Sequence, residues 1–190
     1  MLLSLRIQLA EIKNPPVWRR LTVPAQFSFH KLHLSIQLAF GWENYHLYQF
    51  SIDGFNSDES ISVPHEDDWH KVEDSKKVKL SRVFSTVGQK YVYIYDYGDH
   101  WTHNITVEKV EDIKASKADC IAGVGACPPE DCGGPGGYQD LKKILLKPKH
   151  SEYESIKGWL GLEEDEQWDP AAFDLEKTRA VISKVKSIER

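Results

Sequence analysis

The stretch "KYVYIYDYGDHWTHNITVEKV", residues 90–110, carries the strongest indication of fold in the sequence. Two runs rich in tyrosine, valine, isoleucine and threonine, residue types enriched in strands, flank a short polar segment around Gly98-Asp99. A glycine at the first central position of a two-residue turn supplies the positive φ that such a hairpin requires. We therefore expect an antiparallel hairpin that turns at Gly98-Asp99.

This turn determines which side chains share a face, because directly opposed residues of a hairpin lie on the same side of the sheet. It places Asp96 opposite Trp101 and Ile94 opposite His103, so an acid and an imidazole become diagonal neighbours on an apolar face. A hydrogen-bonded pair of buried polar groups is favoured here over a catalytic dyad. The other face then carries a stripe of tyrosines: Tyr91, Tyr93 and Tyr95.

The residues at the start of the chain predict two strands and a helix. Alternating leucine and isoleucine in residues 3–9 predicts a half-buried strand, and residues 17–23 predict its hairpin partner. Ser28 suits the N-cap of a helix and Gly41 suits its C-terminal end. We therefore expect one helix directly after the second strand.

The middle of the chain is less regular. A strand is expected at "HLYQFSI", residues 46–52, whereas residues 54–78 are polar and unpatterned and predict an exposed excursion. A short helical turn is expected at residues 80–85, before the central hairpin. Residues 113–125 are interpreted as a linker.

Residues 138–190 predict a helical C-terminal part. In its last helix Asp169 is the expected N-cap and Pro170 the first helical residue. Strands that precede helices along a chain are typical of α+β proteins. We therefore expect an α+β fold with a mainly antiparallel sheet built from hairpins, one helix after the second strand, and helices packed at the C-terminal part.

Composition narrows the classes of function. The chain carries 24 Lys and Arg against 29 Asp and Glu, a net charge of −5, so no overall positive field attracts nucleic acid or anionic lipid. The sequence lacks both a signal peptide and a run of about 18 apolar residues, so no membrane association is expected. An odd number of cysteines fits a reducing compartment. We expect a cytoplasmic protein with a single domain over residues 1–190.

The loop "ACPPEDCGGPGGY", residues 126–138, admits more than one kind of site. Cys120, Cys127 and Cys132, joined by His103, have the donor types of a tetrahedral zinc site, which makes zinc the candidate cofactor. The gaps of six and four residues between the cysteines differ from the paired Cys-x2-Cys spacing of most structural zinc sites. Buried, inert thiols are the alternative.

The acids of this region suggest a different site. A phosphodiester hydrolase would hold Mg²⁺ through carboxylates such as those of Asp96, Asp99, Glu130 and Asp131. The alternative is that they are ordinary turn residues that cap backbone amides. The same acids disfavour a phosphate cradle at "GGPGG", and they disfavour Cys127 as a nucleophile because neighbouring carboxylates raise a thiol pKa.

Nucleic acid is a possible partner that the sequence does not favour. Trp18-Arg19-Arg20, the tyrosine stripe and "KKILLKPKH", residues 142–150, combine aromatic and basic side chains in the manner of single-strand binders. The isoelectric point near 5.9 argues against this partner.

Three long blocks resemble a known family. They are "PPVWRRLTVP" running into "LHLSIQLAFGWENYHLYQF", then "YDYGDHWTHNI", then "ACPPEDCGGPGGYQDL". Together with "DPAAFD" they resemble the Ri-plasmid ORF-three-like family over residues 2–180. The resemblance implies an α+β domain and a shared surface, without a known reaction. The family's "HLH" appears here as His46-Leu47-Tyr48, so one imidazole is missing.

The resemblance also implies a set of signature residues. In this sequence the family's signature positions correspond to Trp18, Arg19, His33, Gly41, Trp42, His46, Asp96, Gly98, Asp99, Trp101, His103, Cys127, Pro128, Pro129, Glu130, Asp131, Gly133, Gly134, Gly137, Tyr138, Asp169, Pro170, Phe173 and Asp174.

The sequence favours a non-catalytic binding or interaction module for an unknown ligand or protein partner over an enzyme. Its binding surface is expected where the 96–103 hairpin meets the 126–138 loop, on Asp96, Asp99, Trp101, His103, Glu130, Asp131 and Tyr138. A metal-dependent phosphodiester hydrolase, a nucleic-acid-associated protein and a structural zinc-binding protein stay open as alternatives.

Overall fold

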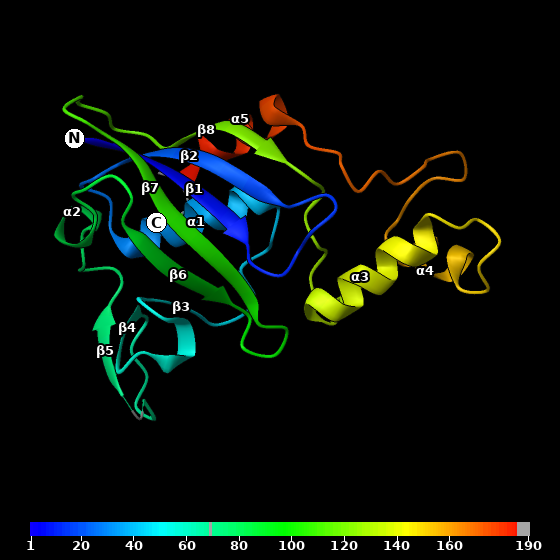
Figure 1. Ribbon diagram of the computed structural model, residues 1–190, viewed down its shortest axis with the longest axis horizontal. Coiled ribbons are helices and arrows are strands. Elements are labelled where there is room, and N and C mark those ends of the chain that lie inside the picture. Colours follow the sequence, from blue (N-terminus) through cyan, green and yellow to red (C-terminus); the bar gives the residue numbers. More distant parts are fainter. Residues whose placement is uncertain (69, 186–190) are drawn as a thin grey trace.

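The computed structural model describes residues 1–68 and 70–185 (Figure 1). Within these residues eight strands form one sheet in the order β5-β4-β3-β6-β7-β1-β2-β8, and its pairs are antiparallel except β4 with β5. The predicted α+β fold with a mainly antiparallel sheet is confirmed. Trp69 and the end of the predicted C-terminal part, residues 186–190, lie outside the described residues.

Figure 1 shows the elements in their places. The strands are β1 Leu2–Leu9, β2 Trp18–Pro24, β3 Tyr48–Ser51, β4 Glu59–Ser62, β5 Lys71–Asp74, β6 Lys90–Tyr95, β7 Trp101–Glu111 and β8 Asp119–Val124. The helices are α1 Phe29–Phe40, the 3-10 helix η1 Gly54–Asn56, α2 Leu80–Val83, α3 Gly134–Leu145, α4 Tyr153–Trp159 and α5 Leu175–Ile182. None of the helices in residues 1–68 and 70–185 combines the length and hydropathy that crossing a bilayer requires.

The core lies between the sheet and α1, which is on one of its faces (Figure 1). The alternating side chains of β1 from Leu3 to Leu9 are fully buried, and those of α1 meet them every three or four residues. Ser28 caps α1 by accepting a hydrogen bond from Lys31 N, and Gly41 ends it with a φ of 85°. The bend after Gly41 directs the chain back toward the sheet.

The central hairpin forms, but its expected register is wrong by one residue. Tyr95 pairs with Trp101 and Tyr93 with His103, so five residues, 96–100, connect the strands. The positive φ angles belong to Asp96 and His100 rather than to Gly98. A shift of one residue exchanges the faces. The tyrosine stripe therefore packs in the core beside His103 instead of lining an open face.

Two segments without an apolar pattern extend the sheet. Residues 54–78, expected to be an exposed excursion, supply β4 and β5, and Ile61 and Ser75 in this segment are buried. Residues 113–125, interpreted as a linker, supply the edge strand β8. Backbone hydrogen bonds hold these three short strands at or next to the edges of the sheet, so their sequences need not alternate between apolar and polar side chains.

The last described helix begins later than expected. Asp174, not Asp169, is the N-cap, and its Oδ1 accepts a hydrogen bond from Lys177 N at 2.9 Å. Asp169 instead closes a turn by accepting from Ala171 N, and Pro170 O accepts from Ala126 N at 3.0 Å. This segment therefore anchors the start of the 126–138 loop.

Candidate functional site

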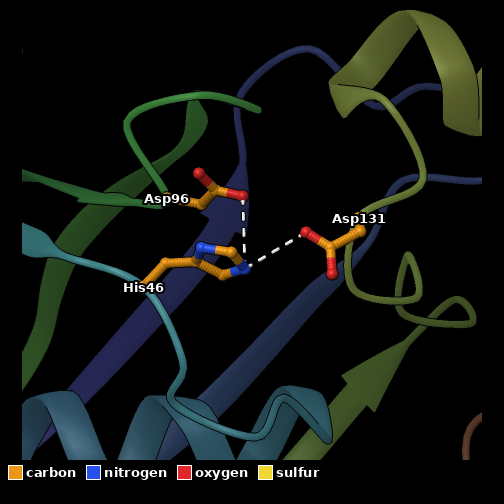
Figure 2. Close-up of side chains that lie close together, drawn as sticks. All are labelled: His46, Asp96 and Asp131. Carbon is orange, nitrogen blue, oxygen red and sulfur yellow. Dashed lines mark ion pairs between the residues drawn. The ribbon is translucent and has the colours of Figure 1, made fainter.

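Three loops converge at one end of the sheet. Residues 42–47 join α1 to β3, residues 96–100 join β6 to β7, and residues 125–133 join β8 to α3. We call this place the three-loop site. Figure 2 shows His46 from the first loop, Asp96 from the second and Asp131 from the third, with their polar ends directed toward one another.

One imidazole nitrogen is the centre of the site. His46 Nε2 lies 3.3 Å from Asp131 Oδ1, 3.7 Å from Asp96 Oδ2 and 3.9 Å from Glu130 Oε2. The ligand atoms of His46, Asp96 and Asp131 all lie within 4.8 Å of one another. Among the His, Cys, Asp and Glu side chains of the described residues, no other three come together in this way.

The site is shielded on one side and open on the other. His46 Nε2 and Glu130 Oε2 are covered by protein, and neither has a hydrogen-bond partner among the described residues. The Asp96 side chain is only 10% exposed, whereas that of Asp131 is 71% exposed. A small ligand would therefore approach from the side of Asp131 and meet the covered atoms beneath it.

A buried hydrogen-bond network holds the 42–47 loop. Burial lowers the pKa of His33 to about 3, so its ring is neutral, with one nitrogen donating and the other accepting. Nε2 donates to Asn44 Oδ1 at 2.6 Å, and Nδ1 accepts from Tyr93 OH at 2.8 Å. Gln37 donates to the Tyr93 oxygen and accepts from Asn44 N. Asn44, whose φ is 61°, is thereby held in the left-handed region.

Glu130 joins the third loop to the first. Its Oε1 accepts hydrogen bonds from Glu43 N at 2.8 Å and from Tyr95 OH at 2.9 Å. The Tyr95 oxygen in turn accepts from Tyr45 N at 3.1 Å. Burial and the neighbouring Glu130 raise the pKa of Tyr95, which keeps its proton for this bond. The second carboxylate oxygen of Glu130 is left facing His46.

The two aspartates of the cluster have unusual backbone conformations. Asp96 has a φ of 56° and Asp131 a φ of 54°, values that cost a non-glycine residue of order 1 kcal/mol or more. Asp96 N donates to Leu47 O, and Asp96 Oδ1 accepts from Gly98 N at 2.8 Å. Its Oδ2 remains directed at His46. Strained residues that the surrounding structure maintains are typical of functional sites.

Glycines allow the third loop to reach the hairpin. A Cβ at Gly137 would lie 1.8 Å from the Cys132 carbonyl oxygen, and one at Gly134 would lie 2.6 Å from the Asp99 carbonyl oxygen. Gly133 N also donates to Asp99 Oδ2 at 3.2 Å. Asp99 therefore positions the start of α3 instead of joining the other carboxylates around His46. Of the four acids expected to share an ion, Asp96 and Asp131 are in the close group and Glu130 is beside it.

Three residues expected on the binding surface are in the core. Trp101, His103 and Tyr138 are fully buried. Burial lowers the pKa of His103 to about 3, and its Nδ1 donates to Trp101 O at 2.8 Å. Its ring contacts the rings of Phe40 and Trp42 edge-on. His103 therefore packs in an aromatic environment, and the expected pair of His103 with Asp96 does not form.

The expected zinc set is not brought together. The three cysteines and His103 do not form a group of neighbouring ligand atoms within the described residues. Burial raises the pKa of all three thiols, that of Cys132 to about 12, so they are protonated and poorly suited to metal binding or nucleophilic attack. Cys120 and Cys127 instead belong to the apolar packing beneath the loop.

Several of the groups expected to bind nucleic acid are buried, whereas Lys143, Lys147 and Lys149 are exposed. Tyr93 and Tyr95 are in the core. Arg19 is also buried, and its guanidinium donates to main-chain oxygens, among them Ala39 O and Val124 O at 2.9 Å. Lys142 is covered as well and donates to a main-chain oxygen of the β1–β2 connection. These side chains stabilise the fold.

His46 is the residue of the site that the surface prediction left out. The sequence feature that could have identified His46 is its position in "YHLY", which belongs to the signature implied by the family resemblance. Residue spacing alone gave no reason to bring the 42–47 loop to the hairpin tip.

Comparison with known proteins gives consistent matches. The family model described as "Plasmid pRiA4b ORF-3-like protein" matches residues 1–177. "Uncharacterized protein y4hQ" of Sinorhizobium fredii (strain NBRC 101917 / NGR234) is 35% identical over 150 residues, covering 78% of this chain and 75% of the relative. The crystal structure of "Protein of Unknown Function MM3350" from Methanosarcina mazei Go1 is 32% identical, with a TM-score of 0.75 over 92% of this chain and 96% of the other. The chain therefore belongs to the family of plasmid pRiA4b ORF-3-like proteins.

Proposed function

We propose that the protein is a non-catalytic binding module whose three-loop site takes a cationic ligand. One observation carries the proposal: His46 Nε2 is covered, has no hydrogen-bond partner in the described part of the chain, and faces the carboxylates of Asp96, Glu130 and Asp131. Among the described residues, no lysine or arginine forms an ion pair with these three acids. The site is therefore negative and lacks a permanent counter-charge.

Electrostatics favours a cation at this place. Two unit charges 4 Å apart interact by about 4 kcal/mol near a protein surface. Three carboxylates within 4 Å of one nitrogen therefore repel one another unless a positive charge lies between them. A cationic ligand between the carboxylates offsets this repulsion, which solvent screens in part because Asp131 is exposed.

The loops need little reorganisation to bind. Hydrogen bonds already hold the Glu130 carboxylate, the backbone of the 42–47 loop at Asn44, and the Asp96 carboxylate. A preorganised site avoids much of the entropy that ordering of side chains costs. This supports binding as the role of the surface. The expectation of a cytoplasmic protein remains a prediction and is supported by three unpaired cysteines.

The proposal is tested by titrating the ¹⁵N-labelled full chain with Zn²⁺, Mg²⁺, butylammonium and guanidinium, with sulfate as the anionic control. We expect at least one cation to shift the amide resonances of residues 42–47, 96–100 and 125–133 more than those of β1 and β2. Asp131→Asn should weaken that response, whereas Asp140→Asn, an equally exposed acid in α3, should leave it unchanged. If no cation perturbs the three loops more than sulfate does, the proposal is wrong.

A further inference from the structure

We infer that the cation of the three-loop site is a divalent first-row transition metal, bound by His46 Nε2, Asp96 Oδ2 and Asp131 Oδ1. This inference rests on the proposed function, because a metal ion is one class of cationic ligand. It is narrower, because it names the ligand atoms and excludes organic cations as the natural occupant.

The distances fit a metal better than a bare ion pair. A protonated imidazole that bonds a carboxylate would approach it to about 2.7–2.9 Å. The nitrogen is 3.3 Å and 3.7 Å from the two aspartate oxygens instead. Ligands about 2.1 Å from one ion lie roughly 3.0–3.4 Å apart in octahedral or tetrahedral geometry. The two nitrogen–oxygen distances are thus close to those around one ion, and the two aspartate oxygens lie within 4.8 Å of each other.

Asp96 gives an independent indication of a ligand. Its side chain is nine-tenths buried, and its Oδ1 is used by Gly98 N. Its Oδ2 accepts no hydrogen bond from the described residues and points toward His46 (Figure 2). The covered His46 Nε2, which has no hydrogen-bond partner among the described residues, faces this oxygen at 3.7 Å, and a buried polar atom left unsatisfied is costly. A metal ion satisfies both at once.

The donor set selects the kind of metal. Imidazole nitrogen suits zinc, iron and other first-row transition metals, whereas Mg²⁺ and Ca²⁺ prefer oxygen ligands throughout. Three protein ligands leave coordination positions for solvent, on the side where Asp131 is 71% exposed. Glu130 Oε2 is 3.9 Å from the His46 nitrogen and is not part of the group of His46, Asp96 and Asp131. It therefore contributes negative charge near the metal without coordinating it.

The first test measures metal binding to the full chain after it has been stripped with a chelator. We expect one equivalent of Zn²⁺ and of Mn²⁺ to bind in calorimetry, and Ca²⁺ to bind far more weakly. His46→Gln should lower the Zn²⁺ affinity by roughly 100-fold or more, since even the loss of outer partners costs 10–100-fold. Asp140→Asn is the matched control and should bind like the original protein.

Two further measurements keep the inference falsifiable. If His46→Gln does not fold, Asp131→Asn carries the test, because this exposed side chain contributes little to packing. The absorption of bound Co²⁺ separates this site from the cysteines, since ligation by nitrogen and oxygen lacks the intense band of a thiolate-to-metal transition. A thiolate band, or binding of less than about a tenth of an equivalent, would overturn the inference. So would a Zn²⁺ affinity of His46→Gln and Asp131→Asn equal to that of the original protein.

The outcomes also separate this inference from the proposed function. If butylammonium or guanidinium shifts the three loops but Zn²⁺ and Mn²⁺ do not bind, the site takes a cation that is not a metal. If metals and organic cations both fail, the inference and the proposed function are wrong together.

Discussion

The two imidazoles on either side of the bend after α1 are held in opposite ways. His33 is fully buried, and each ring nitrogen has a hydrogen-bond partner, Asn44 or Tyr93. The side chain of His46 is 28% exposed, and within residues 1–68 and 70–185 its Nε2 has no hydrogen-bond partner although three carboxylates face it. His33 thus holds the loop in place, and the loop presents His46. Satisfied polar groups are typical of a structural role, whereas an unsatisfied nitrogen that faces carboxylates can be satisfied by a bound ion or water.

The largest expected effect is the loss of stability in mild acid. His33 and His103 have pKa values of about 3 in the folded protein, against an ordinary 6.5 in the unfolded chain. Below pH 6.5 the unfolded chain takes up protons that the folded one excludes, so stability falls as pH falls toward 3. Between pH 6.5 and pH 5 each histidine should cost about 2 kcal/mol.

Urea denaturation at several pH values measures this effect. His33→Phe should remove about half of the pH-dependent loss. Equal slopes for the original protein and His33→Phe would contradict a neutral, buried His33.

The second effect is the stability cost of breaking the network at neutral pH. His33→Phe retains an aromatic ring but leaves Asn44 Oδ1 and the Tyr93 hydroxyl without their shared partner. The free energy of unfolding should fall by about 1–3 kcal/mol, because the Tyr93 hydroxyl loses its acceptor in the core, whereas the exposed Asn44 can bond to water. His46→Gln should change it by less than about 0.5 kcal/mol. Similar losses for both variants, measured in urea, would remove the distinction between the two histidines.

A third prediction concerns neighbouring glycines in the first turns of α3. Alanine at Gly137 meets the Cys132 carbonyl oxygen at 1.8 Å, so the 125–133 loop must move. We expect a net loss of about 2 kcal/mol and weaker cation binding, despite the better helix propensity of alanine. Gly136→Ala is the control, because its Cβ meets nothing within 4 Å.

Without that contact, Gly136→Ala should gain about 0.5–1 kcal/mol from helix propensity alone. Thermal unfolding and the cation titration measure both variants side by side. If Gly137→Ala is as stable as Gly136→Ala, the close approach of the loop to α3 is not needed.

The smallest effect is expected at the open side of the site. Asp131→Asn removes one of the mutually repelling carboxylates, and the metal-free protein should gain about 0.5 kcal/mol or less. The same variant should lose cation binding, so stability and binding change in opposite directions. A clear loss of stability in chelator-treated protein would show that Asp131 has a structural role.

The sequence predicted the antiparallel hairpins of the sheet because apolar alternation in residues 3–9 and 17–23 depends on local pattern alone. It did not predict the register of the central hairpin. Gly98 resembled a turn glycine, but the left-handed positions are Asp96 and His100, and aspartate tolerates this conformation through its short polar side chain. The edge strands β5 and β8, and β4 beside β5, were missed because backbone pairing leaves no periodic trace in polar segments.

Part of the site was also predicted from local sequence pattern. Asp96, Glu130 and Asp131 were identified as site residues, since acids next to turn residues are visible in the sequence. Trp101 and His103 were expected on the binding surface although the hairpin pattern already placed them on an apolar face, and both are fully buried. The contribution of His46 depends on how α1 returns its C-terminal loop to the hairpin tip. That is a long-range contact, and no local spacing encodes it.

Glu130 has a consequence for how this surface can diversify. One of its oxygens joins the 42–47 loop to β6, and the other faces the place where a ligand would lie. Selection for the connection between the 42–47 loop and β6, and selection for ligand binding, therefore act on the same side chain. Glutamine at position 130 could keep the joint while changing the charge, whereas shorter or apolar residues would lose both. New specificities should accordingly arise at the exposed Asp131 before they arise at its neighbour.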